Sequence, residues 1–352
     1  MRQIVGAMLR HACTQVRHVT AVRQSEARGD VAAVYTQAVR DFGVLAPPLA
    51  LHSPSPPALA AAWAMLREGL LVDGATDRAA RERVAAAVSR ANACPYCVDV
   101  HRATYETLDG AADEDPELTA WARAGADPGA GTPPWPASWQ PAQRAEFLAV
   151  AVVFHYLNRM VTLFLAESPM PAAVPGPVRG PMMRTVARAM RPAGAASPAP
   201  GRSLPLLPAA PPPDGFSWAE DVPAAADAFG RAAAATDAAV HWLPEPVRAL
   251  VTGRLDAGDH PRGPSRAWFS DAVAGLPAAD RPAAALALLV AYAPYQVTDQ
   301  DVAAFRARHP GDRALIELTS WAALRSALGT GRRLGREQEA RTAPRADRGR
   351  RT

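Results

Sequence analysis

The 352-residue sequence contains no lysine, so every one of its 38 basic residues is an arginine. Without a lysine amine the chain cannot form a Schiff base with a carbonyl substrate, and it cannot provide the lysine of a P-loop. Both classes of site are therefore excluded. The net charge of +4 is mild and does not by itself indicate a nucleic-acid partner.

Cysteine is scarce as well, with only Cys13, Cys94 and Cys97 in the chain. An odd number of cysteines in a chain of this size argues against a disulfide scaffold, and Met1–Arg10 lacks the apolar core of a secretory signal. We therefore expect a reducing, cytoplasmic setting, in which a cysteine pair indicates catalysis or metal binding.

Strand-forming patterns are also missing, because no segment shows sustained alternation of apolar and polar residues. Alanine dominates the apolar residues and favours helices over sheets. Apolar residues spaced three and four apart predict helices over Ala58–Leu71, Arg78–Ala91 and Arg144–Leu165. Between the last two, Asp109–Trp139 has the glycines, prolines and acids of a surface insertion. The sequence predicts an all-α fold.

One apolar segment, Phe147–Leu165, is nearly long enough to span a membrane. It contains His155, Asn158 and Arg159, and an arginine in the middle of a bilayer costs about 2.5–3.5 kcal/mol or more. A buried core helix is the better interpretation, and we expect no membrane partner.

Proline divides the chain, because residues 166–215 hold 13 of its 35 prolines. Proline breaks helices, so this stretch is predicted to be a linker with one short helical piece, Met182–Met190. The predicted organisation is a helical domain over 1–165, the linker over 166–215, a second helical domain over 216–335 and a basic, disordered tail over 336–352. The tail's arginines have no aromatic residues among them for base stacking, so a solvated tail is favoured over a nucleic-acid arm.

The chain resembles itself when shifted by 199 positions. Cys94-Pro95-Tyr96-Cys97-Val98 falls on Ala293-Pro294-Tyr295-Gln296-Val297, and both segments follow an alanine-rich helix pattern. The match is short, but it indicates a tandem duplication with a degenerate second copy. None of the reactive residues is repeated: the positions of Cys94, Cys97, His101 and Glu82 hold Ala293, Gln296, Gln300 and Arg281.

The strongest chemical pattern is Glu82, eleven residues, then Cys94-x-x-Cys97-x-x-x-His101. Proline is favoured at the first position of a helix, so Pro95 predicts a helix that begins at Cys94. The two cysteines and the histidine are then three and four residues apart and share one face. An i,i+3 cysteine pair is close enough to form a disulfide.

This arrangement provides a nucleophile, a base and a second thiol. The start of the helix carries partial positive charge, which favours the reactive thiolate form of Cys94. His101 lies one turn after Cys97 and can take that thiol's proton, while Glu82 can orient His101. The two effects act on different sulfur atoms, so the residues alone do not rank the cysteines.

Three other interpretations remain open. Cys94, Cys97 and His101 offer three zinc ligands, but a fourth is needed, for which His155 is the only neighbour in sequence order. The string Cys-Pro-Tyr-Cys also occurs in glutaredoxins, whose fold needs a strand before the motif, whereas a helix pattern precedes it here. The third interpretation is two core cysteines beside a histidine without a catalytic role.

The motif Glu82-x11-Cys94-x-x-Cys97-x-x-x-His101 resembles the signature of the AhpD-like alkylhydroperoxidases of the carboxymuconolactone decarboxylase superfamily. The preceding segment, residues 85–92, and the later segment, residues 154–160, also resemble helices of that family. The resemblance covers about residues 40 to 165. It implies an all-α, usually oligomeric, helical bundle that reduces hydroperoxides by thiol chemistry, and we expect no cofactor and no metal ion.

The resemblance also implies roles for the residues. Cys97 would attack the peroxide, Cys94 would resolve the product, His101 would act as the base and Glu82 as the relay carboxylate. The electrons would come from a dithiol donor, such as a lipoylated protein. AhpD itself has a histidine where this chain has Tyr96, which leaves the substrate, rate and donor open. Because true lactone decarboxylases lack the cysteine pair, decarboxylation is disfavoured.

The degenerate second half and the long linker support an alternative function, which is a non-catalytic redox-sensing or scaffold protein of the same superfamily. This alternative predicts slow or absent turnover with peroxide.

Overall fold

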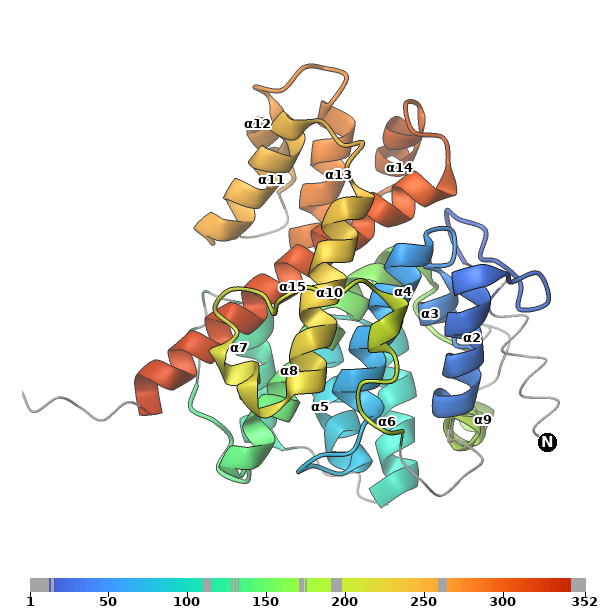
Figure 1. The fold of residues 1–352 in the computed structure, drawn as a ribbon, viewed down its shortest axis with the longest axis vertical. Coiled ribbons are helices and arrows are strands. Elements are labelled where there is room, and N and C mark those ends of the chain that lie inside the picture. The colour runs from blue at the N-terminus through green and yellow to red at the C-terminus, as the bar shows by residue number, and fades with distance from the viewer. Residues whose placement is uncertain are drawn as a thin grey trace, which may run out of the picture.

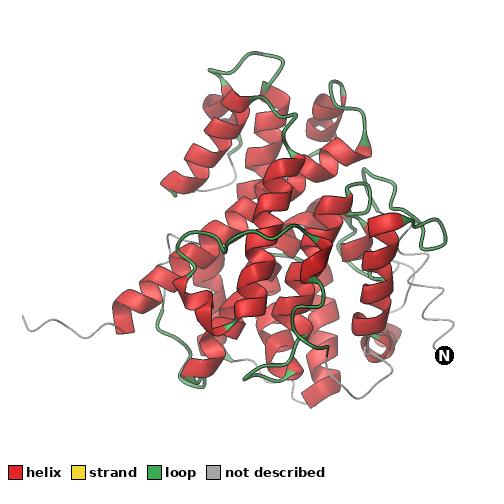
Figure 2. Cartoon of the chain, in the orientation of Figure 1, coloured by secondary structure: helices red, strands yellow, loops and turns green. Residues whose placement is uncertain are grey.

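The structure is a computed structural model and describes residues 13, 16–109, 115–127, 129, 131, 133–170, 174, 176–190, 198–258 and 265–342. Helices joined by loops make up this part of the chain (Figure 2), with no strand among these residues. The all-α prediction is confirmed. Met1–Arg10, for which we expected no signal peptide, lies outside the described residues.

The first half forms a bundle in which the predicted helices are present (Figure 1). The predicted helix over 78–91 has those bounds in the structure, and the one over 58–71 is a helix that ends in a π-helical turn. The elements are α2 (Gly29–Phe42), α3 (Pro47–Ala50), α4 (Pro56–Leu66), η1 (Arg67–Leu71), α5 (Arg78–Ala91), α6 (Pro95–Asp109), α7 (Pro116–Ala126) and α8 (Pro141–Phe164).

Helix α8 is the central helix of this bundle. It is long and apolar enough to cross a membrane by length and composition, yet 89% of its most apolar window is buried inside the protein. A helix that is apolar on all sides is stable in water only when other elements surround it. Helix α8 is therefore a core helix, as its polar residues predicted.

Two segments differ from what proline and glycine predicted. Helix α9 (Gly176–Ala189) begins well before the expected short helix and packs against α6, although Pro181 lies inside it. The expected surface insertion contains α7, whose Trp121 is fully buried and stacks on Trp135. In both cases burial of an apolar face outweighs the local preference for a loop.

The second half adds another set of helices, and α15 crosses the whole molecule (Figure 1). Helix α15 packs along α8, and α10 packs against α4. A single continuous hydrophobic core includes residues of both halves. The elements are η3 (Leu204–Leu206), η4 (Ser217–Asp221), α10 (Pro223–Ala239), α11 (Glu245–Ala257), α12 (Ala267–Val273), α13 (Arg281–Tyr292), η5 (Pro294–Gln296), α14 (Asp299–Arg306) and α15 (Asp312–Thr342).

The second half has the same order of elements around Pro294 as the first half has around Pro95. Helix α13 ends just before Pro294, as α5 ends just before Pro95. In the second half, however, Pro294 starts only a short 3-10 turn, Val297 is extended and α14 begins at Asp299. The repeat thus keeps the order helix, proline, helix but not the continuous helix that carries the cysteines.

Part of the predicted C-terminal tail, residues 336–352, is helical. Helix α15 continues to Thr342, so the first residues of the stretch predicted as a disordered tail are helical, and residues 343–352 lie outside the described part. The boundaries proposed for the two domains and the linker remain predictions.

We expect two glycine substitutions to have opposite effects on stability. A Cβ atom at Gly230 in α10 would clash with the carbonyl oxygen of Pro211, whereas nothing lies within 4 Å of such an atom at Gly253 in α11. Gly230→Ala should lower the free energy of unfolding by about 1–3 kcal/mol. Gly253→Ala should raise it by about 0.5–1 kcal/mol, because alanine favours a helix over glycine. Urea unfolding measures both changes in free energy, and equal effects would contradict the packing of Ala210 and Pro211 against α10.

Candidate active site

The site is built on the turn between α5 and α6. Asn92 ends α5, Ala93 takes a left-handed conformation with φ of 52°, and Cys94 follows directly before Pro95. The amide of Cys94 donates to the carbonyl of Ser89 at 2.9 Å and that of Ala93 to Arg90 at 3.1 Å. These two bonds form a Schellman motif. Cys94 therefore occupies the N-cap of α6, which begins at Pro95, one position after the helix start that the sequence predicted.

The two thiols of the predicted pair lie side by side. The Sγ atoms of Cys94 and Cys97 are 2.7 Å apart, and both cysteines are free. Both residues are buried, with 2% and 4% of their surface exposed. Since a disulfide needs a separation of about 2.05 Å between its sulfur atoms, oxidation of this pair requires only a small movement.

The surroundings affect the two thiols in opposite ways. The side-chain hydrogen bond from Cys97 lowers the pKa of Cys94 despite its burial, and the Cys97 amide, Thr162 and Asn158 act in the same direction. Burial raises the pKa of Cys97, and the neighbouring Cys94 raises it further. At the N-cap, a sulfur atom can accept a hydrogen bond from the third residue of the helix, as an N-cap oxygen does. Cys94 is thus the thiol that the structure favours as the thiolate.

His101 is held by a buried carboxylate. Its Nδ1 lies 2.5 Å from Oε2 of Glu82, while Nε of Arg78 donates to Oε1 of Glu82 at 2.6 Å. Burial alone would raise the pKa of Glu82, but the charges and hydrogen bonds of Arg78 and His101 hold it below its usual value. The carboxylate therefore stays ionised and fixes the ring of His101, which also contacts Phe154 edge-on.

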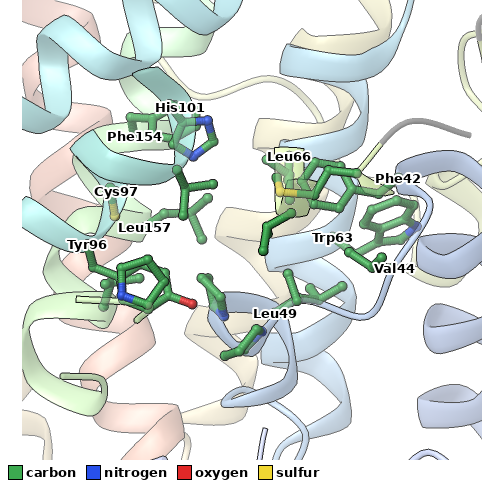
Figure 3. A pocket seen from close by; sticks show the side chains of 18 of the residues that line it. Phe42, Val44, Leu49, Trp63, Leu66, Tyr96, Cys97, His101, Phe154 and Leu157 are labelled. Atoms are coloured by element: carbon green, nitrogen blue, oxygen red, sulfur yellow. The ribbon is translucent and has the colours of Figure 1, made fainter. Parts of the chain in front are cut away.

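A cavity of about 170 Å³ opens beside Cys97 and His101. In Figure 3, Cys97, His101, Phe154 and Leu157 lie on one side of the cavity, and Trp63 and Leu66 face them. The rest of the lining is almost entirely apolar. It comes from the end of α2, the segment after it with α3, from α6, from α8 and the segment after it, and from α9 and the residue after it: Phe42, Val44, Ala46, Pro47, Pro48, Leu49, Tyr96, Val100, Val161, Pro169, Met170, Val186 and Met190.

Cys94 does not line this cavity, so the two sulfur atoms differ in access as well as in pKa. Cys97 faces the apolar space, together with the imidazole of His101. Tyr96 also lines the cavity, and burial, followed by the nearby thiols, raises the pKa of its phenol. Tyr96 is thus a neutral hydroxyl near physiological pH.

The structure brings Cys94, Cys97, His101 and Glu82 together, but it places two other candidates elsewhere. His155 is buried near Gly125 of α7 and Arg333 of α15. Among the described residues, no group of three or more His, Cys, Asp or Glu side chains could hold a metal ion. Cys13 donates to the carbonyl of Leu45, and burial raises its pKa to about 11, as suits an unreactive thiol.

Sequence reasoning missed several groups at this site. Arg78 lies one turn before Glu82 on α5, a spacing at which an ion pair could have been expected. Asn158 and Thr162 lie four residues apart on α8 and both affect Cys94. The sequence indicated the α9 wall of the cavity only in part, through the predicted helical piece Met182–Met190, because the prolines around it predicted a linker.

Comparison with known proteins gives two matches. The model of the carboxymuconolactone decarboxylase family matches residues 57–144, which include Glu82, both cysteines of the pair and His101. A protein of Mycobacterium tuberculosis (strain ATCC 25618 / H37Rv) named alkyl hydroperoxide reductase Rv2159c is 38% identical over 346 residues, which cover 92% of this chain and 96% of the relative.

We expect the charge of Glu82 to contribute to stability. Glu82→Gln should lower the free energy of unfolding at pH 7 by about 3 kcal/mol, because it leaves Arg78 without its buried partner. The folded-state pKa of Glu82 is lowered, so its contribution is complete above the unfolded value of about 4.3 and is lost as the pH falls. Urea unfolding of both proteins at pH 7 and pH 4 should show the difference shrinking in acid.

The matched control is Glu106→Gln on α6. Glu106 also pairs with an arginine four residues away, Arg102, but on the surface, where such a pair contributes only about 0.5 kcal/mol. Equal losses in the two variants would show that Glu82 is not held as a buried ion.

Proposed function

The chain belongs to the carboxymuconolactone decarboxylase family as an AhpD-like member, and we propose that it reduces organic hydroperoxides through the dithiol of Cys94 and Cys97. The observation that carries this proposal is the position of Cys97. Its thiol faces an apolar cavity beside His101, and a second thiol lies 2.7 Å behind it. The relative named alkyl hydroperoxide reductase supports the same activity.

The proposed reaction begins at Cys97. His101 takes the proton of Cys97, and the thiolate attacks the terminal oxygen of the hydroperoxide. The O–O bond breaks, the sulfur becomes a sulfenic acid, and the leaving alkoxide receives the proton from His101 and departs as an alcohol. Glu82 accepts a hydrogen bond from the Nδ1–H of His101, which leaves Nε2 for this proton transfer.

The second step uses the other thiol. The thiolate of Cys94 attacks the sulfur of the Cys97 sulfenic acid, hydroxide leaves and takes up a proton as water, and the Cys94–Cys97 disulfide forms. A dithiol donor, such as a lipoylated protein, returns the disulfide to two thiols by exchange. The donor, a homo-oligomeric state and a cytoplasmic location belong to the proposal through the resemblance.

The lining of the cavity indicates the class of substrate. Among the residues that the structure describes, none with a charged side chain lines it, apart from His101. An apolar organic group gains free energy by entering such a space, whereas hydrogen peroxide has no apolar group to bury. We therefore propose a neutral organic hydroperoxide as the substrate.

Mass spectrometry after one equivalent of cumene hydroperoxide tests the dithiol. We expect a Cys94–Cys97 disulfide in the wild-type protein and no peroxide consumption by Cys97→Ser, because this variant lacks the attacking sulfur. Cys13→Ser is the matched control and should keep full turnover. Two thiols that stay reduced would overturn the proposal, and a disulfide without catalytic turnover would support the redox-sensing alternative.

Partly filling the cavity tests the substrate class. Val44 is only partly buried in the lining, so Val44→Trp should fold while it narrows the cavity. We expect kcat/KM for cumene hydroperoxide to fall at least about tenfold, and kcat/KM for hydrogen peroxide to change little. The control, Val39→Trp, changes an exposed residue of α2 outside the cavity. Equal losses for both peroxides would argue against binding of the organic group in this cavity.

A further inference from the structure

Two methionines line the cavity that contains the thiol of Cys97. Met170 lies in the segment after α8, and Met190 lies directly after α9, where its amide donates to the carbonyl of Val186 at 3.1 Å. Val186 lines the cavity as well, one helical turn before Met190. The cavity therefore holds two thioethers in addition to the thiol that is proposed to attack the peroxide.

Exposure to solvent does not distinguish these two methionines from a neighbour outside the cavity. Met170 and Met190 are 7% and 5% exposed, and Met183 of α9 is 6% exposed. Met183 is not among the described residues that line the cavity, and the next residue before it, Met182, is only half-buried. A peroxide in bulk solvent should reach Met182 first, whereas a peroxide bound in the cavity should reach Met170 and Met190.

We propose that Met170 and Met190 are oxidation sites, at which an organic hydroperoxide bound in the cavity converts the thioether into a sulfoxide. The polar sulfoxides then weaken the binding of the next organic peroxide, so that the cavity regulates its own affinity. This inference rests on the proposed peroxidase function, because it takes the proposed substrate as the oxidant.

The oxidation is balanced without a further reactant. The lone pair of the methionine sulfur attacks the terminal oxygen of the hydroperoxide, the O–O bond breaks, and the proton of that oxygen moves to the alkoxide, which leaves as an alcohol. The sulfur is oxidised by two electrons to a sulfoxide, and the peroxide is reduced. Because a thioether has no proton to lose, this reaction needs no base.

The thiol and the thioethers react at different stages. The thiolate of Cys97 is the better nucleophile and consumes the peroxide as long as a donor keeps it reduced. After the disulfide with Cys94 has formed, Cys97 has no thiolate, whereas the methionine sulfur atoms remain reactive. Sulfoxides therefore accumulate when the peroxide exceeds the supply of the donor.

A sulfoxide changes the lining of the cavity in a defined way. It replaces a flexible apolar side chain by a polar one, and a buried polar group without a hydrogen-bond partner costs free energy. An apolar organic group offers no such partner, so its entry leaves the sulfoxide oxygen unpaired. Oxidation should therefore lower the affinity for organic hydroperoxides.

The first experiment locates the oxidation in a protein without the attacking thiol. Cys97→Ser is treated with excess cumene hydroperoxide, and peptide mass spectrometry follows each methionine. We expect Met170 and Met190 to be oxidised at least about tenfold faster than Met183, because binding holds the peroxide in the cavity. With hydrogen peroxide, Met182 should be oxidised first. Oxidation that follows solvent exposure with both peroxides would overturn the inference.

The second experiment measures the effect on catalysis. Wild-type protein is treated with excess cumene hydroperoxide without a donor, and dithiothreitol then reduces the cysteines but not the sulfoxides. We expect kcat/KM for cumene hydroperoxide to fall about tenfold from the untreated value, as burial of an unpaired polar group predicts. Methionine sulfoxide reductases should restore it, whereas they do not repair a cysteine that is oxidised beyond the sulfenic acid.

The matched control is the double variant with Met170→Leu and Met190→Leu, which nearly conserves volume. Its kcat/KM after treatment should equal its own value before treatment. An equal fractional loss in this variant, or a loss that the reductases do not reverse, would overturn the regulatory role.

The outcomes also separate this inference from the proposed function. Sulfoxides at Met170 and Met190 in a wild-type protein that does not turn over peroxide would support the oxidation sites and overturn the peroxidase. Turnover of cumene hydroperoxide without these sulfoxides, even after the donor is exhausted, would support the peroxidase and overturn the oxidation sites.

Discussion

The reversal of the chain at Ala93 is the constraint on which the arrangement of the site depends. A left-handed conformation costs a residue with a side chain about 1–2 kcal/mol, and among the described residues only Ala93 and His18 adopt it without being glycine. The two hydrogen bonds that end α5 offset this cost. Because the turn is short, α5 and α6 pack closely, Cys94 becomes the N-cap of α6, and Glu82 on one helix meets His101 on the other.

Buried ion pairs stabilise the packing of α5 and α6 on either side of this turn. Glu82 is stable as a buried ion because Arg78 and His101 surround it. A second buried network follows the same principle at η1, where Arg67 pairs with Asp41 and donates to the carbonyl of Ala199, and Glu68 accepts from Ser203. Removing one partner of such a network is costly. The network therefore fixes the residues before η3 against η1.

The spacing of residues along helices predicted much of the site, whereas the rest of the site depends on contacts between segments that are distant in the sequence. Helical spacing alone predicted that Cys94, Cys97 and His101 share a face, and the helix Arg78–Ala91 has the predicted bounds. The sequence predicted only a short helical piece, Met182–Met190, in place of the longer α9, because prolines indicate only the local backbone preference, whereas buried Met183 and Val186 stabilise the helix through distant contacts. The ranking of the two thiols had the same limitation, since Asn158 and Thr162 of α8, which lower the pKa of Cys94, lie more than 60 residues from it in the sequence.

The second half contributes to the site through α8 rather than through residues of its own. Phe154, Leu157 and Val161 of α8 face the cavity, while Arg159 donates to the carbonyl of Ala291 in α13 and Val152 lies against Gly331 of α15. A helix that is apolar on all sides needs partners on all sides, and α15 covers the side of α8 that the first half leaves open. The second half, which has no cysteine, histidine or glutamate at the matching positions, therefore supports the site by burying the face of α8 that lies away from the cavity.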